Sequence, residues 1–214
     1  MIRNALILFA CLLVLACASK PKDALKDGLT PAPTAASASV PTDGVVVVSL
    51  WYRAARLGDV ETLKRLSADR EKQPIDHIDG NGVTALMVAA RSGQVEAVRF
   101  LLANGADVNR SDREWATALG YAVLGAADDG KRMAVAKLLI ENGADPFLPD
   151  GFGAVPVREL VSLGYLEIVK TLNFKESFAC DRAKAPRGDE SIVELARKSE
   201  QPKLVQYLQS IGCQ

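Results

Sequence analysis

Apolar residues between positions 79 and 111 recur at helical spacing in two short runs, and polar residues separate them. The apolar positions of the first run are Ala85, Leu86, Ala89 and Ala90, and those of the second are Val95, Val98, Leu101 and Leu102. This spacing predicts two short antiparallel helices that each bury one face. Thr84 is expected to cap the first helix, and Gly93 to end it with a positive φ.

The same pattern then begins again along the chain. Asp112 and Thr117 each lie 33 positions after Asp79 and Thr84. A third copy follows, with Gly153 placed 71 positions after Gly82. A period of this length is typical of a solenoid, in which one unit cannot bury its apolar face without neighbours. A binding surface is therefore a better expectation than a catalytic centre.

The unit from 79 to 111 resembles the ankyrin repeat. The resemblance rests on a Thr-Ala-Leu opening at Thr84, on Asn104-Gly105 after the second helix, and on turn residues from Asp79 to Gly82. Ala85 stands where the family usually has proline, and Met87 where it usually has histidine. The resemblance implies an all-α solenoid of about five helix-pair repeats with short hairpin fingers, which binds proteins and is not an enzyme.

On this basis the folded part of the chain is expected to span residues 45–214. Its repeats are predicted at about 45–78, 79–111, 112–148, 149–180 and 188–214, the first and last being degenerate caps. The copy beginning at Asp112 is about five residues longer, and the excess, around Gly125 to Lys131, is expected between its two helices. Pro156 is expected at an early helix position, where proline is tolerated.

The N-terminus has a different character. A positive charge at Arg3 precedes an apolar run that is short for a transmembrane helix but suits a signal peptide, here residues 1–16. Val14 to Cys17 resembles the lipobox of bacterial lipoproteins, which implies cleavage before Cys17 and lipidation of Cys17. Ordinary cleavage after Ala18, giving a soluble periplasmic protein, is the alternative.

Residues 17–44 are rich in Ala, Ser, Thr and Pro and lack hydrophobic periodicity. Such a segment cannot collect a core, so a flexible tether with a reach of about 90 Å is expected. Resemblance to Gram-negative lipoproteins implies the inner leaflet of the outer membrane, facing the periplasm, since no aspartate follows Cys17. The membrane is then contacted only through the lipid.

Cysteine parity leads to a further prediction. Three cysteines remain after processing, and lipid on Cys17 leaves Cys180 and Cys213 as an even pair in an oxidising compartment. We therefore expect a Cys180–Cys213 disulfide. Two reduced, partly buried thiols are the alternative.

Composition and motifs supply little chemistry. Lys plus Arg and Asp plus Glu both number 26, so no basic field indicates nucleic-acid binding. His77 is the only histidine; it lies near no nucleophile motif and is expected at the finger surface. No cofactor, metal or catalytic residue is predicted, and Asp128 and Asp129 are expected in a solvated turn.

By resemblance, partners contact the finger tips and the helix ends on the concave face. The partner-binding candidates are His77, Asn81, Arg91, Arg110, Arg113, Glu114, Trp115 and Phe152. Trp115 replaces the turn glycine of the other fingers, and is expected either to contact a partner or to fold back on the neighbouring repeat. Phe152 is open to the same two interpretations, with exposure favoured. Leu124 and Leu163 are expected to pack inside.

These observations predict a monomeric, non-enzymatic module that binds another protein. Bacterial envelope ankyrin proteins include some proposed as immunity partners of exported toxins, which is the function favoured here by resemblance. An adaptor or scaffold, linked to oxidant protection or to peptidoglycan, is the alternative. An envelope enzyme would need a catalytic constellation that the sequence does not offer.

Overall fold

The computed structural model describes residues 44–68, 74–125, 127–172, 180, 183 and 190–213, with side chains from Leu50 onward. The described residues belong to the compact unit Ser39–Gln214. The predicted signal peptide, Cys17 and most of the tether lie outside them. No described helix has the length and apolar character that crossing a bilayer requires.

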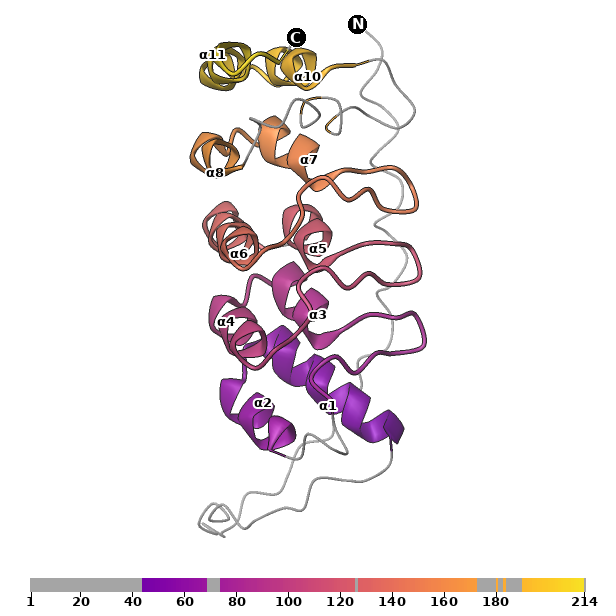
Figure 1. The fold of residues 1–214 in the computed structure, drawn as a ribbon. Helices are drawn as coiled ribbons and strands as arrows, with labels where there is room; N and C mark the ends of the chain where they lie inside the picture. Colours follow the sequence, from indigo (N-terminus) through magenta and orange to yellow (C-terminus); the bar gives the residue numbers. More distant parts are fainter. Residues whose placement is uncertain are drawn as a thin grey trace, which may run out of the picture. The chain divides into compact units, whose positions relative to one another are not determined.

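Ten helices in the described residues form five successive pairs (Figure 1). The pairs are α1 (Gly44–Leu57) with α2 (Val60–Ser67), α3 (Ala85–Arg91) with α4 (Val95–Ala103), α5 (Ala118–Leu124) with α6 (Asp129–Glu141), α7 (Pro156–Ser162) with α8 (Leu166–Thr171), and α10 (Ile192–Lys198) with α11 (Pro202–Ser210). The described part contains no strand, only the isolated bridges Ile78–Thr84 and Ser111–Thr117. The predicted all-α solenoid is confirmed.

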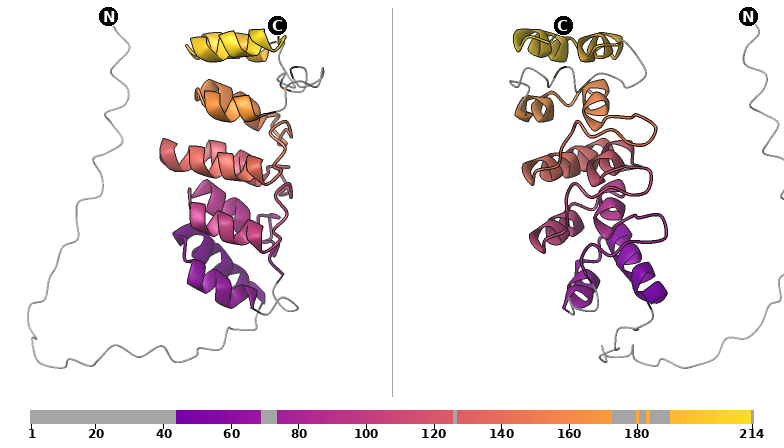
Figure 2. Two further views of the ribbon diagram at one scale, coloured as in Figure 1. Left: turned by 60° about the vertical axis from the view of Figure 1, so that its left-hand side comes forward. Right: turned by 45° about the vertical axis from the view of Figure 1, so that its right-hand side comes forward.

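The helices stack in two rows (Figures 1 and 2). The inner row consists of α1, α3, α5, α7 and α10, and the outer row of α2, α4, α6, α8 and α11. Three loops project beside the inner row; they are called here the first finger (78–84), the second finger (111–117) and the third finger (149–155).

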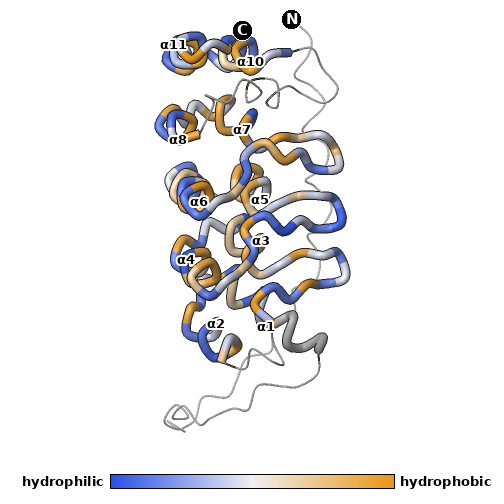
Figure 3. Tube along the Cα trace, in the orientation of Figure 1, coloured by the Kyte–Doolittle hydropathy of each residue, from blue (hydrophilic) through white to orange (hydrophobic). Residues whose placement is uncertain are grey.

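Small residues explain how closely the inner helices approach one another. Ala85, Ala89, Ala90, Ala118 and Ala122 are all fully or almost fully buried. Larger apolar side chains such as Leu101 and Leu139 fill the space toward the outer row, where they too are fully buried. Figure 3 shows hydrophobic positions along the helices and a mainly hydrophilic second finger. The buried residues form one continuous core.

The predicted helix caps are present. Thr84 Oγ1 accepts a hydrogen bond from the Met87 backbone N–H at 3.3 Å, and Thr117 caps α5 in the same way. Pro156 is the first residue of α7, where its missing N–H leaves no hydrogen bond unmade. Gly93 has φ of 68°, as predicted.

The longer repeat differs from the prediction. Its extra residues were expected between two helices, but α6 already begins at Asp129, so part of the excess lengthens this helix to 13 residues. Asp128 is the N-cap of α6 and accepts from the Lys131 N–H at 3.0 Å. Asp129 lies in the first turn and pairs with Arg132 at 3.0 Å. These two carboxylates are exposed, as expected, but they stabilise the start of a helix and do not lie in a turn.

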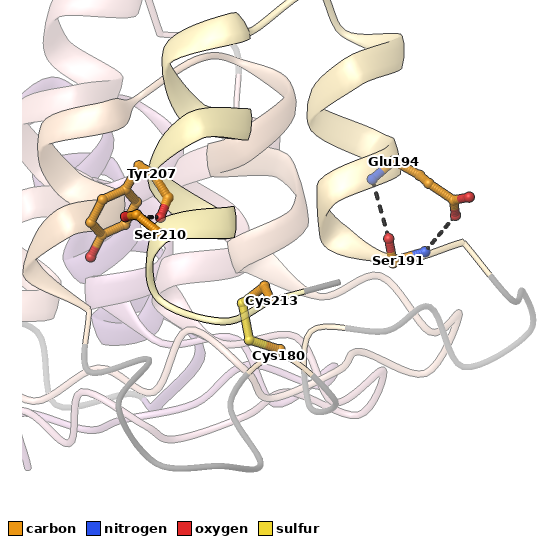
Figure 4. Close-up of a disulfide and its surroundings, with 6 residues drawn as sticks. All are labelled: Cys180, Ser191, Glu194, Tyr207, Ser210 and Cys213. Carbon is orange, nitrogen blue, oxygen red and sulfur yellow. Dashed lines mark hydrogen bonds between the residues drawn. A yellow bond between two sulfur atoms is a disulfide. The ribbon is translucent and has the colours of Figure 1, made fainter.

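The last pair of helices is joined to the stack through Arg158. Its guanidinium donates to the carbonyl oxygens of Ala183 and Glu190, both at 3.1 Å, and to the Glu190 carboxylate at 2.8 Å. The neighbouring helix α10 begins with a capping box, in which Ser191 and Glu194 exchange hydrogen bonds (Figure 4).

A disulfide links Cys180 to Cys213, with the Cα atoms 5.6 Å apart (Figure 4). Cys213 follows α11 and is 3% exposed. The bond closes a loop with a sequence separation of 33 around the last helix pair.

Candidate protein-binding groove

The three fingers share one hydrogen-bond pattern built on an aspartate. In the second finger, Asp112 Oδ1 accepts from the backbone N–H groups of Glu114 at 2.8 Å and Ala116 at 2.9 Å. Asp79 and Asp150 make the equivalent two bonds in the first and third fingers. A short acceptor side chain that bonds its own backbone in this way fixes the turn.

Adjacent fingers are also bonded to each other. The Arg113 N–H donates to the Asn81 carbonyl at 2.9 Å, and the Gly151 N–H donates to the Glu114 carbonyl at 2.6 Å. The backbone of Arg113 and Glu114 is therefore held from both sides. The backbone that carries the side chains of the second finger is therefore held in one conformation.

Trp115 occupies a backbone conformation that favours glycine. Its φ is 61°, whereas Gly82 and Gly153, at the same place in the first and third fingers, have φ of 83° and 85°. A bulky residue in this region is strained, at a cost of about 1–3 kcal/mol. The Trp115 side chain is 66% exposed. Trp115 therefore does not fold back into the neighbouring repeat, and exposure is the interpretation that the structure supports.

A groove of about 540 Å³ lies between the second and third fingers and the helices α5 and α7. Trp115 and Phe152 line it from the fingers, and Tyr121 and Leu124 line it from α5. Phe152 is 71% exposed, in agreement with the interpretation that the sequence favoured. An exposed aromatic pair beside an apolar hollow is typical of a surface that binds a partner.

Leu124 corrects one prediction. It was expected to pack inside, but it is the last residue of α5 and is 61% exposed. The helix ends there because Gly125 follows, and Gly125 packs against the backbone of the preceding repeat. This places the leucine at the open edge of the groove. Leu163, also expected inside, is half-buried at the end of α7.

Tyr121 connects the groove to the second finger. Its hydroxyl donates to Asp112 Oδ2 at 2.8 Å. Burial raises the pKa of Tyr121 above its ordinary value of 10.0, and the hydrogen bond to the Asp112 carboxylate raises this pKa further. The phenol therefore remains a neutral donor at physiological pH.

A second hollow, of about 510 Å³, continues along the inner row toward α1. It is lined by Tyr52, Arg56 and Val88, and it shares Arg91 and Tyr121 with the groove. The Tyr52 hydroxyl donates to the Val83 carbonyl in the first finger. Burial raises the pKa of Tyr52 to about 12, with a contribution from the charge of Asp79.

Four of the eight predicted partner-binding residues line the groove, namely Arg91, Glu114, Trp115 and Phe152. The other four, which do not line it, are His77, Asn81, Arg110 and Arg113. His77 and Arg110 are half-buried, and Asn81 and Arg113 are exposed. The groove therefore uses only part of the finger surface that the sequence indicated.

The sequence interpretation missed Tyr121 and Tyr52. It considered only finger tips and helix ends, while both tyrosines lie within inner helices. Tyr121 has the position in its repeat that Val88 has in the preceding one, 33 residues earlier. A comparison of the half-buried inner-helix positions between repeats would have found it.

The described residues show no arrangement that suggests catalysis. Within them, no three His, Cys, Asp or Glu side chains lie where they can hold a metal ion. Two of the titratable groups that line the groove, Asp150 and Tyr121, hold the geometry of the fingers through hydrogen bonds.

Comparison with known proteins agrees with the geometry. Residues 51–150 match the family model for ankyrin repeats in three copies. This match begins within α1 and runs through α6, so it includes the first and second fingers and the start of the third finger up to Asp150. Ankyrin repeats are a protein-interaction fold.

Several curated proteins contain a similar region. "Ankyrin repeat and SAM domain-containing protein 6" of Rattus norvegicus is 28% identical over 123 residues, which cover 56% of this chain and 13% of that protein. "Ankyrin repeat and KH domain-containing protein mask-1" of Caenorhabditis elegans is 39% identical over 90 residues (42% and 3%). An ankyrin repeat protein of Rickettsia bellii (strain RML369-C) is 38% identical over 94 residues (44% and 28%).

The chain thus spans less than a third of the length of each of these relatives. What they share with it is the repeat region. The period, the helix pairs, the fingers and the family match agree, and the stack of helices is an ankyrin repeat solenoid.

Proposed function

We propose that this protein is a non-enzymatic module that binds another protein through the groove between its second and third fingers. The observation that carries the proposal is the exposure of Trp115 and Phe152, at 66% and 71%, on opposite fingers beside one apolar hollow. Aromatic side chains supply large contact area with little loss of rotamer entropy, so they are common anchors of interfaces.

Two further features support this surface. The finger backbone beneath Trp115 and Phe152 is tied by the hydrogen bonds of Asp112 and Asp150, so binding costs little ordering of the loops. The strained φ of Trp115 is also informative, because strain at an exposed residue is commonly associated with function.

We further propose that the solenoid faces the bacterial periplasm, anchored by lipid on Cys17. The support is the lipobox-like segment ending at Cys17 and the low-complexity segment after it. A Cys180–Cys213 disulfide suits an oxidising compartment such as the periplasm. A tethered binder captures a partner efficiently, since tethering raises the local concentration.

Within this setting we propose that the module neutralises an exported toxin as its immunity partner. An inhibitor needs a rigid binding surface, and the groove has one. An envelope scaffold that binds peptidoglycan or a structural protein is the second candidate, favoured by the length of the tether alone.

The binding proposal is tested by affinity capture from envelope extracts with the full chain. We expect one protein to be captured by the wild type and lost in a Trp115→Ala/Phe152→Ala variant. A Leu57→Ala/Met133→Ala variant is the matched control, because both residues are exposed and apolar but lie outside the groove. Equal capture by the wild type and the groove variant would overturn the assignment of this surface.

Localisation and role need separate experiments. Metabolic labelling with a radioactive fatty acid should mark the wild type and not a Cys17→Ala variant, and membrane fractionation should follow the label. Unlabelled soluble protein would favour simple secretion. Binding to purified sacculi instead of to a soluble protein would favour the scaffold over the immunity partner.

A further inference from the structure

The free charges of the groove are mainly negative. Among its lining residues, Glu114, Asp150 and Glu159 are acidic, and only Arg91 and Arg158 are basic. The guanidinium of Arg158 already donates hydrogen bonds to the Glu190 carboxylate and to two backbone carbonyls, and its side chain is only 14% exposed. The charge of Arg158 is therefore already paired. The carboxylates of Glu114 and Glu159 form no ion pair with any described residue.

The positive charge of the inner row lies further along, over the second hollow. Arg56 and Arg91 line that hollow, and both are exposed. Asp79 is its acidic member, and its Oδ1 already accepts two backbone hydrogen bonds. The surface beside the inner helices therefore has a positive part near α1 and α3 and a negative part near α5 and α7, with Arg91 at the border between them.

The negative part coincides with the apolar part. Glu114 is adjacent to Trp115 in the second finger, and Glu159 faces the groove from α7. Aromatic faces attract cations through their quadrupole, so aromatic and carboxylate groups together favour the same kind of side chain. A negatively charged segment would meet repulsion there instead.

From this charge complementarity we infer that the groove binds a partner segment in which a lysine or arginine stands next to a large apolar residue. The apolar side chain packs on Trp115, Phe152 and Leu124. The cationic group pairs with Glu114 and Glu159. This inference rests on the proposed function and specifies the partner chemistry of the same groove.

The test uses a library of short random peptides displayed on phage, selected on the immobilised full chain. We expect enrichment of peptides that combine Lys or Arg with an adjacent Trp, Phe or Leu. A synthetic copy of an enriched peptide should bind about tenfold more weakly to a Glu114→Gln/Glu159→Gln variant, and binding of this peptide to the wild type should weaken as salt rises.

A charge reversal provides the sharper control. Selection on Glu114→Lys/Glu159→Lys should enrich acidic peptides. Selection on Glu141→Lys/Glu167→Lys, which has the same net charge but changes the outer helices α6 and α8, should still enrich basic ones.

The outcomes separate the inference from the proposed function. Peptides that need Trp115 and Phe152 but carry no basic residue would overturn the inference and leave the binding groove in place. Peptides that bind the Trp115→Ala/Phe152→Ala variant as well as the wild type, or no enrichment at all, would overturn both. Enrichment of acidic peptides on the wild type would overturn the inference and would indicate that the partner binds the positive part of the surface, around Arg56 and Arg91.

Discussion

The Tyr121 hydroxyl donates a 2.8 Å hydrogen bond to Oδ2 of Asp112, whose other carboxylate oxygen accepts the two N–H groups that shape the second finger. One carboxylate thus joins helix α5 to the loop that presents Trp115. Asp112 is 8% exposed, so water does not easily replace the phenol. The position of the finger above the groove depends on this pair.

We expect Tyr121→Phe to destabilise the protein by about 1.5–3 kcal/mol, the usual range for a hydrogen bond to a charged group. Urea unfolding followed by circular dichroism measures this change.

The Tyr121–Asp112 hydrogen bond should also make the stability of the protein depend on pH. Because folding raises the pKa of Tyr121, the contribution of this tyrosine to the free energy of unfolding is complete below pH 10.0. That contribution is lost as the pH rises further. An alkaline unfolding profile unchanged by Tyr121→Phe would contradict this.

Trp115→Gly is expected to stabilise the fold by about 1 kcal/mol, since glycine adopts φ of 61° without strain. Trp115→Ala should not give this gain, because alanine still has a Cβ. Thermal unfolding of the wild type and of the two variants measures these differences in stability. Equal unfolding midpoints for the Gly and Ala variants would show that glycine releases no backbone strain. Both variants should lose the bound partner.

Gly125→Ala tests the close approach of two repeats. A Cβ at Gly125 would lie 2.5 Å from the Arg91 carbonyl oxygen and 2.8 Å from that of Tyr121. Neither backbone atom moves easily, so we expect a loss of about 1–3 kcal/mol. Gly80→Ala is the control, since nothing lies within 4 Å of its added Cβ. Similar urea midpoints for the two variants would mean that the interface between these repeats yields.

Arg158 and Glu190 should make the last helix pair sensitive to acid. Lys198 lowers the pKa of Glu190 by hydrogen bonding, and the charge of Arg158 lowers it further. The stabilisation is therefore present above the ordinary pKa of 4.5 and is lost as pH falls through the lower folded-state pKa. Glu190→Gln should flatten the acid limb of a thermal unfolding profile. An unchanged acid limb would exclude this carboxylate as its source.

Arg158→Ala has a separate expected cost of about 2–3 kcal/mol, because it leaves the carbonyls of Ala183 and Glu190 without their donor. Arg158→Lys should recover only part of this loss, since an ammonium lacks the planar fork that makes three contacts. Hydrogen exchange of α10 amides reports the effect locally. Full recovery by lysine would mean that charge alone matters.

Reduction of the Cys180–Cys213 disulfide should destabilise the last helix pair. Closing a loop with a sequence separation of 33 contributes about 3–4 kcal/mol in the chain-entropy model. We expect a reductant to lower the unfolding midpoint of the wild type and to leave a Cys180→Ser/Cys213→Ser variant unaffected. A thiol assay of the unfolded, unreduced protein that detects both thiols would contradict the bond.

Local patterns along the chain are sufficient to predict the repeat architecture. Three signals can be read directly from the sequence, because each depends on residues that are close along the chain. They are the period of 33 residues, small residues such as Ala89 and Ala122 at helical spacing, and Thr84 and Thr117 at helix starts. The same reasoning found Trp115, because it replaces the turn glycine of the other fingers, and Phe152, because it lies at a finger tip.

Which residues form one surface could be seen only in the folded protein. Exposure of Trp115 and Leu124, the partnership of Tyr121 with Asp112, and the commitment of Arg158 to Glu190 all depend on neighbours distant in the sequence or on the stacking of repeats. Such contacts set how much of each side chain meets water and which charges stay free. A groove is made by several repeats together, so no single repeat encodes it.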